Sequence, residues 1–340
     1  MRMNRFLSNQ PLIVLLALCI VVSLSSCKTS GPKIGFMLPH MNSKRYLVER
    51  DVFIAKVKEL GGQVLFMQAD NDEEKQIEQL KEIIKEGIDI LVLDPVNRFR
   101  GAEMVRIAHN KGIKVISYDR LVANCDVDAM VTFDANAIGK KMADYAINKR
   151  PNGNYIILSG DKSDINAVLI YSAVEKALEP SVKSGNIKIL FRSYVEKYAM
   201  EETENNVTLC MNLSMQEPAA IITANDAMAQ GAINALKKAE LDGQVIVTGQ
   251  NADLYGCKNI LAGKQAITIY KPVKKMASTT AEIAVKLTKG EKVSNFFKAI
   301  LNNGSIDVPS IFLDVITVDA SNMKTTVIAD GFYSEAEIYN

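Results

Sequence analysis

Short apolar segments alternate with longer amphipathic segments along most of the chain. This rhythm is typical of stacked βαβ units, in which helices cover a parallel sheet. We therefore predict an α/β fold. The first series of expected strands comprises residues 33–38, 63–69, 88–93 and 114–118, and the helices expected between them are residues 47–60, 73–86 and 101–110.

The rhythm changes after residue 119 and starts again near residue 151. A strand-like segment there leads directly into a helix, which indicates a crossing between two similar lobes. An ancient duplication would explain the likeness of the two series. The alternative is that all sheets of this kind show the same alternation of strands and helices. The expected strands are residues 129–133, 154–158, 187–192, 219–223, 245–247, 266–270 and 311–318, and the expected helices are residues 137–148, 164–178, 200–213, 227–239, 254–261 and 274–288.

The N-terminal segment has the pattern of an export signal. Arg2 and Arg5 precede an apolar segment, residues 11–24, that is too short to span a bilayer, and small residues then lead to Cys27. This resembles a bacterial lipoprotein signal, in which cleavage leaves the cysteine as an acylated N-terminus. An ordinary secretory signal with an incidental cysteine is the alternative. We predict a signal peptide at residues 1–27, a linker at residues 28–32, and a lipid on Cys27 that tethers an exported protein to a membrane.

Composition argues against several function classes. The 40 Lys and Arg residues are interleaved with 39 Asp and Glu residues, which does not favour a nucleic-acid partner. Beyond the signal, Cys125, Cys210 and Cys257 have no metal-ligand spacing and allow at most one disulfide; three small buried side chains are the simpler interpretation. His40 and His109 are far apart in sequence. We therefore predict no metal site, no cofactor and no enzymatic activity.

Polar side chains stand where the predicted strands end, and in parallel sheets ligands bind outside those ends. The set is rich in Asp, Asn and Arg, which can pair hydrogen bonds to neighbouring hydroxyls, as a sugar offers them. Helix capping is the alternative for the aspartates, and surface ion pairs are the alternative for the arginines. These strand-end residues are Asp94, Asn97, Asp119, Arg120, Asp134, Asn136, Asn166, Asn225, Asp226, Gln250, Asn251 and Lys271.

Lys271 is the least easily dismissed of these residues. It follows an apolar strand and precedes Pro272, so we expect it to be half-buried and to need acceptors. Three aromatic residues, Tyr46, Phe133 and Tyr198, could supply flat faces for sugar C–H groups in a chain that has no tryptophan.

Longer stretches carry a more specific likeness, and together they extend from residue 33 to about residue 331. They are KIG at 33–35, ERDVF at 49–53, GIKVISYDR at 112–120, FDANAIG at 133–139, DINA at 164–167, ANDA at 224–227, GQNADL at 249–254, YKP at 270–272, LNNG at 301–304, VPS at 308–310 and IADGF at 328–332. With these stretches the chain resembles the type I, ribose/xylose-like family of periplasmic sugar-binding proteins, and most closely its xylose-binding members.

The resemblance implies two Rossmann-like lobes with parallel sheets, joined by a three-stranded hinge, that close on a sugar. It places residues 33–136 and 271–310 in the N-terminal lobe and residues 137–270 and 311–340 in the C-terminal lobe. It also implies which residues bind the sugar: Arg45, Asp119, Arg120, Asp134, Asn136, Asn166, Asn225, Asn251 and Lys271 by hydrogen bonds, with Tyr46 and Tyr198 stacking.

Three positions depart from the xylose-binding pattern. Tyr46 and Tyr198 stand where the resemblance has tryptophan, and Asn251 stands where it has aspartate. The exchange at Asn251 removes a charged acceptor and adds a donor, which changes the hydroxyl pattern that is recognised. We expect a lipid-anchored periplasmic monomer that binds a pentose-like monosaccharide and delivers it to an ABC-type permease. The alternative is a sugar sensor that presents its closed form to a sensor kinase or a chemoreceptor.

Overall fold

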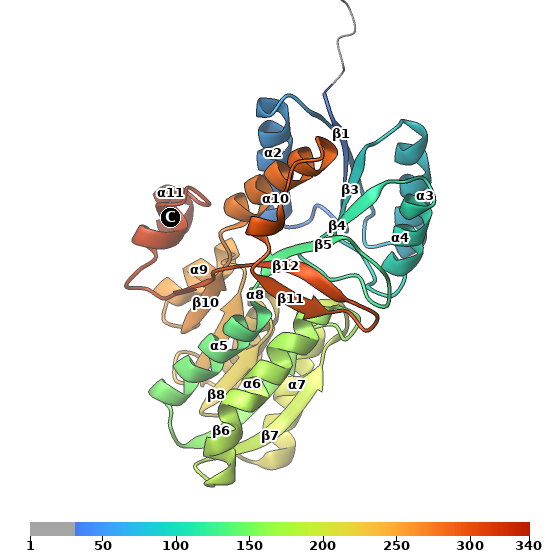
Figure 1. The fold of residues 1–340 in the computed structure, drawn as a ribbon. Helices are drawn as coiled ribbons and strands as arrows, with labels where there is room; N and C mark the ends of the chain where they lie inside the picture. Colours follow the sequence, from blue (N-terminus) through green and yellow to red (C-terminus); the bar gives the residue numbers. More distant parts are fainter. Residues whose placement is uncertain (1–30) are drawn as a thin grey trace, which may run out of the picture. The chain divides into compact units, whose positions relative to one another are not determined.

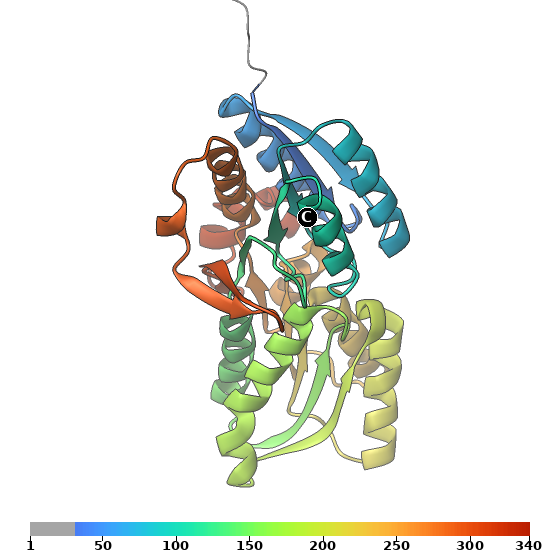
Figure 2. The same cartoon turned by 45° about the vertical axis from the view of Figure 1, so that its right-hand side comes forward.

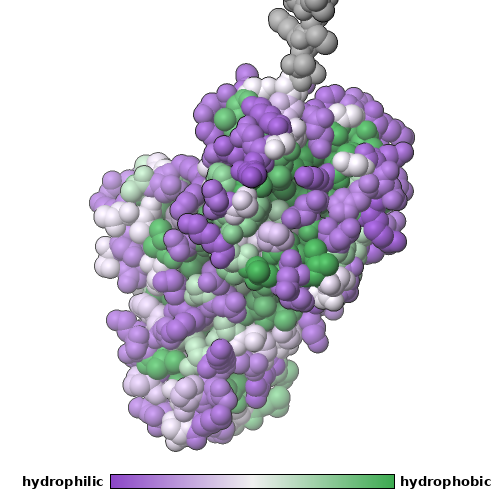
Figure 3. Space-filling model, in the orientation of Figure 1, coloured by the Kyte–Doolittle hydropathy of each residue, from purple (hydrophilic) through white to green (hydrophobic). Residues whose placement is uncertain are grey.

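Two largely parallel sheets organise residues 31–340, the part of the chain that this computed structural model describes (Figure 1). The predicted signal peptide, Cys27 and most of the predicted linker lie outside these residues. Within the described part, no helix is long and apolar enough to cross a membrane. Hydrophilic side chains dominate the face in Figure 3, and hydrophobic ones gather mainly near its middle.

The first sheet has seven strands, which run parallel except for β11. Helices α2 (Lys44–Glu59) and α10 (Val273–Thr288) cover one face, and α3 (Glu73–Lys85) and α4 (Gly101–His109) cover the other. Burial on both faces explains why these strands are apolar runs without alternation. The strand order is β11 (Ala299–Asn302), β12 (Asp307–Leu313), β5 (Ala129–Phe133), β4 (Lys114–Tyr118), β3 (Ile90–Leu93), β1 (Lys33–Leu38) and β2 (Gln63–Gln68).

The second sheet has six strands, and only β13 is antiparallel to its neighbour. Helices α5 (Ala135–Lys149) and α6 (Ile165–Lys183) pack on one face, with α7 (Met200–Ser214) and α8 (Asp226–Lys238) on the other. Shorter helices are η1 (Glu196–Tyr198), α9 (Leu254–Leu261), η2 (Ser294–Phe296), η3 (Lys324–Ile328) and α11 (Glu335–Tyr339). The strand order is β13 (Ile316–Val318), β10 (Ile267–Tyr270), β9 (Ile246–Gln250), β8 (Ala220–Thr223), β6 (Gly153–Ser159) and β7 (Ile187–Tyr194).

Two α/β lobes with mostly parallel sheets confirm the predicted fold class. One predicted element is wrong. The single strand expected at residues 311–318 is two strands, because β12 continues beside β5 as far as Leu313 and β13 then joins the other sheet. The lobe boundary drawn at residue 310 therefore falls inside β12. Figure 2 shows the β11–β12 hairpin, in orange, beside the boundary between the lobes.

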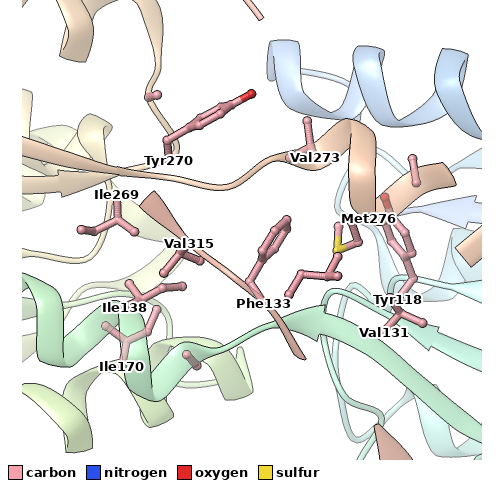
Figure 4. Close-up of a cluster of buried hydrophobic side chains, with 14 of the residues drawn as sticks. Tyr118, Val131, Phe133, Ile138, Ile170, Ile269, Tyr270, Val273, Met276 and Val315 are labelled. Carbon is pink, nitrogen blue, oxygen red and sulfur yellow. The ribbon is translucent and has the colours of Figure 1, made fainter. Parts of the chain in front are cut away.

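Three chain segments connect the lobes, and apolar side chains pack where they cross (Figure 4). The segments lead from β5 to α5, from β10 to α10, and from β12 to β13. Phe133, Tyr270 and Val315, one from each segment, are all buried in the same hydrophobic cluster. This packing positions the two sheets so that the carboxyl ends of several strands lie around one space.

Candidate functional site

A cavity of about 510 Å³ lies between the lobes and is lined by residues from both. This volume is within the range of small-molecule sites. Most of the residues predicted from strand ends and from the resemblance line it. These are Arg45, Tyr46, Asp119, Arg120, Asn166, Tyr198, Asn225, Gln250, Asn251 and Lys271.

Arg45 is the centre of a buried ion network on the first lobe. Its guanidinium donates to Glu49 Oε1 at 2.9 Å and to Asp119 Oδ2 at 2.8 Å, and it lies over the Tyr46 ring. Burial alone would raise the pKa of Asp119, but the charges of Arg45 and Lys271 outweigh it and hold that pKa well below its usual value. Burial raises the pKa of Glu49 to about 7, although Arg45 opposes the shift.

Arg120 reaches from the first lobe to the second. Its Nε lies 3.1 Å from Asp164 Oδ2, and its Nη1 donates to the carbonyl of Pro95. Asp164 uses both carboxylate oxygens, because Oδ1 accepts from the backbone N–H of Asn166 at the start of α6 while Oδ2 also accepts from the Tyr198 hydroxyl at 2.8 Å. The two lobes are thus joined by an ion pair at the cavity.

Two further contacts cross between the lobes. The Asn166 side chain donates to the backbone carbonyl of Asp119 at 3.0 Å. At the start of α2, the Lys44 ammonium pairs with Glu337 of α11 at 2.9 Å and lies over the Tyr333 ring. These contacts identify a closed arrangement of the lobes.

Tyr198 can pack against the β6–α6 loop only because that loop contains a glycine. A Cβ atom at Gly160 would lie 1.9 Å from the Tyr198 ring. Glycine at this position therefore allows the ring to reach the cavity and its hydroxyl to reach Asp164.

Lys271 lies in the segment between β10 and α10, and only 6% of it is exposed. Its ammonium faces the Phe133 ring and has no hydrogen-bond or ion-pair partner among the described residues. Burial lowers the pKa of Lys271 to about 8; the charge of Arg45 adds to this shift, and Asp119 opposes it. A buried cationic donor without an acceptor is costly, which points to a ligand oxygen as its partner.

The second lobe offers polar groups around the same space. Asn225 caps α8 through its Oδ1 and the backbone N–H of Met228 at 2.9 Å. Gln250 Oε1 and Asn251 Oδ1 are buried without a partner in the described part of the chain, although both residues line the cavity. Three residues that line one cavity thus each carry a polar atom that has no hydrogen-bond partner among the described residues.

Asp226 shapes the turn that carries Asn251. This carboxylate is fully buried, and it accepts from the backbone N–H of Asp253 at 2.8 Å and from the Thr268 hydroxyl at 3.0 Å. The turn needs such support because Asn251 has a φ of 94°, which is unfavourable for a residue other than glycine. Asp226 is therefore a structural residue of the site rather than a lining one.

The structure does not bring Asp134 and Asn136 into the cavity. The Asp134 side chain accepts from the backbone N–H of Ala137 and so caps α5, and Asn136 is exposed. Neither residue lines the cavity. Capping is the alternative that the sequence had left open for aspartates at such junctions.

Sequence reasoning missed several lining residues. Asp164 was not among the predicted site residues; one of its carboxylate oxygens caps α6, and the other pairs with Arg120 at the cavity. Gln250 belongs to the predicted strand-end residues but not to the residues that the resemblance implies. His40 gave no sequence signal; burial and then the charge of Arg120 lower its pKa to about 4, so the ring is neutral at pH 7. Asp253 also lines the cavity.

The cysteines of the described residues are not part of the cavity. Cys125, Cys210 and Cys257 are free and buried, which confirms their interpretation as small buried side chains. Within residues 31–340, no group of His, Cys, Asp and Glu is arranged to hold a metal ion.

Comparison with known proteins places this geometry in a family. The model of the periplasmic binding protein domain matches residues 34–292. The chain is 37% identical to the D-xylose-binding periplasmic protein of Escherichia coli K12 over 96% of this chain and 98% of that protein. It is also 37% identical to the protein of the same name from Haemophilus influenzae, over 94% and 96% of the two chains.

Two solved structures of solute binding proteins are also similar to this chain. An ABC transporter solute binding protein from Clostridium phytofermentans with bound β-D-glucose has a TM-score of 0.82 and 28% identity, covering 90% of this chain and 99% of that one. A carbohydrate transporter solute binding protein from Chloroflexus aurantiacus, in complex with D-glucose, has a TM-score of 0.79 and 26% identity, covering 89% and 97%.

The family and these relatives are named as binding proteins, which confirms the prediction of a binding protein rather than an enzyme. The expected family is confirmed as well, since the family model covers most of the chain. The chain belongs to the periplasmic binding protein family.

Proposed function

We propose that this protein binds a monosaccharide, a pentose similar to D-xylose, between its lobes and delivers it to an ABC-type permease. One observation carries the proposal: Lys271, Gln250 and Asn251 line one cavity, and among the described residues the Lys271 ammonium and the side-chain oxygens of Gln250 and Asn251 have no hydrogen-bond partner. A sugar hydroxyl both donates and accepts a hydrogen bond, so a polyhydroxylated ligand can satisfy all three groups. An apolar ligand would leave them unpaired.

The charged groups support the same ligand class. Arg45, Arg120, Asp119 and Asp164 are already paired with protein partners, so these four charges do not require an ionic ligand. Their remaining donors and acceptors are available to neutral hydroxyls. A ligand that contacts both lobes stabilises the closed arrangement by the contacts it gains there.

The relatives support a sugar as the ligand, but they do not identify which sugar it is. The names of two relatives specify D-xylose, and two structural neighbours contain D-glucose. Calorimetric titration with a panel of aldopentoses and hexoses tests the proposal. Micromolar or tighter binding of D-xylose or a related pentose would support it, and no heat with any sugar at millimolar concentration would contradict it.

Asn251→Asp should shift selectivity toward D-xylose by about tenfold, because it restores the aspartate that the resemblance places there and adds a charged acceptor. The ratio of dissociation constants for D-xylose and D-glucose measures the shift. Asn136→Asp is the matched control, since Asn136 is exposed and outside the cavity. An unchanged ratio in Asn251→Asp would assign selectivity to other residues, with Tyr46 and Tyr198 the first to test.

We further propose that the protein is a monomer held at the periplasmic side of a membrane by a lipid on Cys27. The sequence pattern of residues 1–27 supports the lipid anchor. Cys27→Ser should move the protein from the membrane fraction to the soluble periplasmic fraction after cell fractionation, because the acylated residue is lost. Wild-type protein in the soluble fraction would contradict the anchor and leave the sugar proposal untouched.

A further inference from the structure

Asp94 is a buried carboxylate that the closed arrangement leaves without hydrogen bonds. It follows β3 and is 0% exposed, and neither carboxylate oxygen has a hydrogen-bond partner in the described part of the chain. Its backbone is fixed, because its carbonyl accepts from Gln76 Nε2 at 2.9 Å. Buried carboxylates are normally paired and hydrogen-bonded, so this exception requires a physical explanation.

The nearest cation is the guanidinium of Arg120, which lies between two carboxylates. Its Nε is 3.1 Å from Asp164 Oδ2 and 3.8 Å from Asp94 Oδ1. Asp94 and Arg120 belong to the first lobe, whereas Asp164 begins α6 of the second. When the lobes close, Arg120 therefore pairs with Asp164 of the other lobe and moves away from Asp94 of its own lobe.

We propose that Asp94 is a positioning residue that holds Arg120 when the lobes are apart, and that leaving the Asp94 carboxylate without a hydrogen bond on closure favours the open arrangement. Opening carries Asp164 away with the second lobe. The guanidinium can then move the short distance to Asp94, and water can reach both groups. Asp94 thus limits how far the protein closes without its ligand.

The other charged groups near Asp94 do not replace Arg120. Asp119 and Glu49 are acids, and Arg45 is already committed to both of them. Burial raises the pKa of Asp94, and the charge of Arg120 opposes this shift. Removal of the carboxylate charge should therefore relieve a cost that exists mainly in the closed arrangement.

Asp94→Asn tests the inference, because it keeps the shape of the side chain and removes its charge. In the absence of sugar, small-angle X-ray scattering should give a smaller radius of gyration for Asp94→Asn than for the wild type. The variant should also bind sugar about tenfold more tightly, mainly through slower dissociation, since a larger fraction of molecules is already closed. Asp94→Leu should behave in the same way.

Asp164→Asn is the matched comparison. It weakens the closed-state partner of Arg120, so it should enlarge the radius of gyration without sugar and reduce the affinity. Circular dichroism and urea unfolding establish that each variant is folded before the scattering is compared.

Three results would overturn the inference. A larger radius and weaker binding in Asp94→Asn would make Asp94 a closed-state partner of Arg120. Weaker binding at an unchanged radius would make it a direct ligand contact, and no change in either quantity would leave it without a role in closure. The affinity measurement rests on the proposed function, whereas the scattering measurement without sugar does not. Failure of the wild type to bind any sugar would therefore contradict the proposed function alone.

Discussion

Replacement of Arg45 by methionine should lower the free energy of unfolding by about 3–5 kcal/mol and abolish sugar binding. The side chains of Arg45, Glu49 and Asp119 are 7%, 0% and 5% exposed, so the variant keeps two buried carboxylates without their shared cation. Removal of one partner of a buried ion pair typically costs this much. Urea unfolding followed by circular dichroism measures the change, and calorimetry with the best sugar measures the loss of binding.

Arg50→Met is the matched control on the same helix. Arg50 pairs with Asp51 at the surface, where the two side chains are 32% and 65% exposed, so the cost should stay below about 1 kcal/mol. Equal losses for the two variants would contradict the central role given to the buried network.

The cost of Arg45→Met should shrink as the pH falls. In the wild type, the lowered pKa of Asp119 contributes stability that is present above its unfolded pKa of about 3.9 and is lost as the pH falls through the folded value. Glu49 acts in the opposite direction: its raised pKa contributes stability that is present below about 4.5 and is lost as the pH rises through about 7. Without Arg45 both carboxyls should take up protons more readily. The difference between variant and wild type should therefore be largest above pH 7 and smallest near pH 4.

The strands that are buried on both faces were predictable from the sequence. Strands that are covered by helices on both faces are short apolar runs, and the glycines and caps between them mark the helix ends. The change of sheet after Leu313 was not predictable. Only Asp314 and Val315 separate β12 from β13, and nothing in an apolar run states which neighbour it pairs with.

The site was predictable in part for a related reason. Strand ends identify which polar residues can face the cavity, but Asp and Asn at the same junctions also cap helices. Asp134 uses its carboxylate only for capping, whereas Asp164 caps α6 and also faces the cavity. The sequence pattern of the two junctions is alike, so only the backbone geometry separates them. Asp94 and Asp226 stand at strand ends as well, but the strand-end pattern does not separate them from the residues that line the cavity.

Lys271 offers the sharpest pH test of the site. Burial and then the charge of Arg45 lower its pKa to about 8 in the unliganded protein, although the charges of Asp119 and Glu49 oppose this shift. A sugar oxygen that accepts from the ammonium would raise that pKa in the complex. Affinity should therefore be steady below about pH 7 and fall as the pH rises through 8, to about one tenth at pH 9. Calorimetry between pH 6.5 and 9.5 measures this.

The effect of Lys271 on folding has the opposite sign, which separates lost binding from lost structure. Its lowered pKa means that the unfolded chain binds more protons between about pH 8 and 10.5, so this residue makes the unliganded fold more stable as the pH rises through that window. Lys271→Met should weaken binding by roughly 10- to 100-fold at pH 7, as expected for the loss of a charged hydrogen bond, and should remove the pH dependence above pH 8. A Lys271→Met variant whose affinity still falls between pH 8 and 9 would show that another group titrates in the cavity and that the ammonium does not contact the ligand.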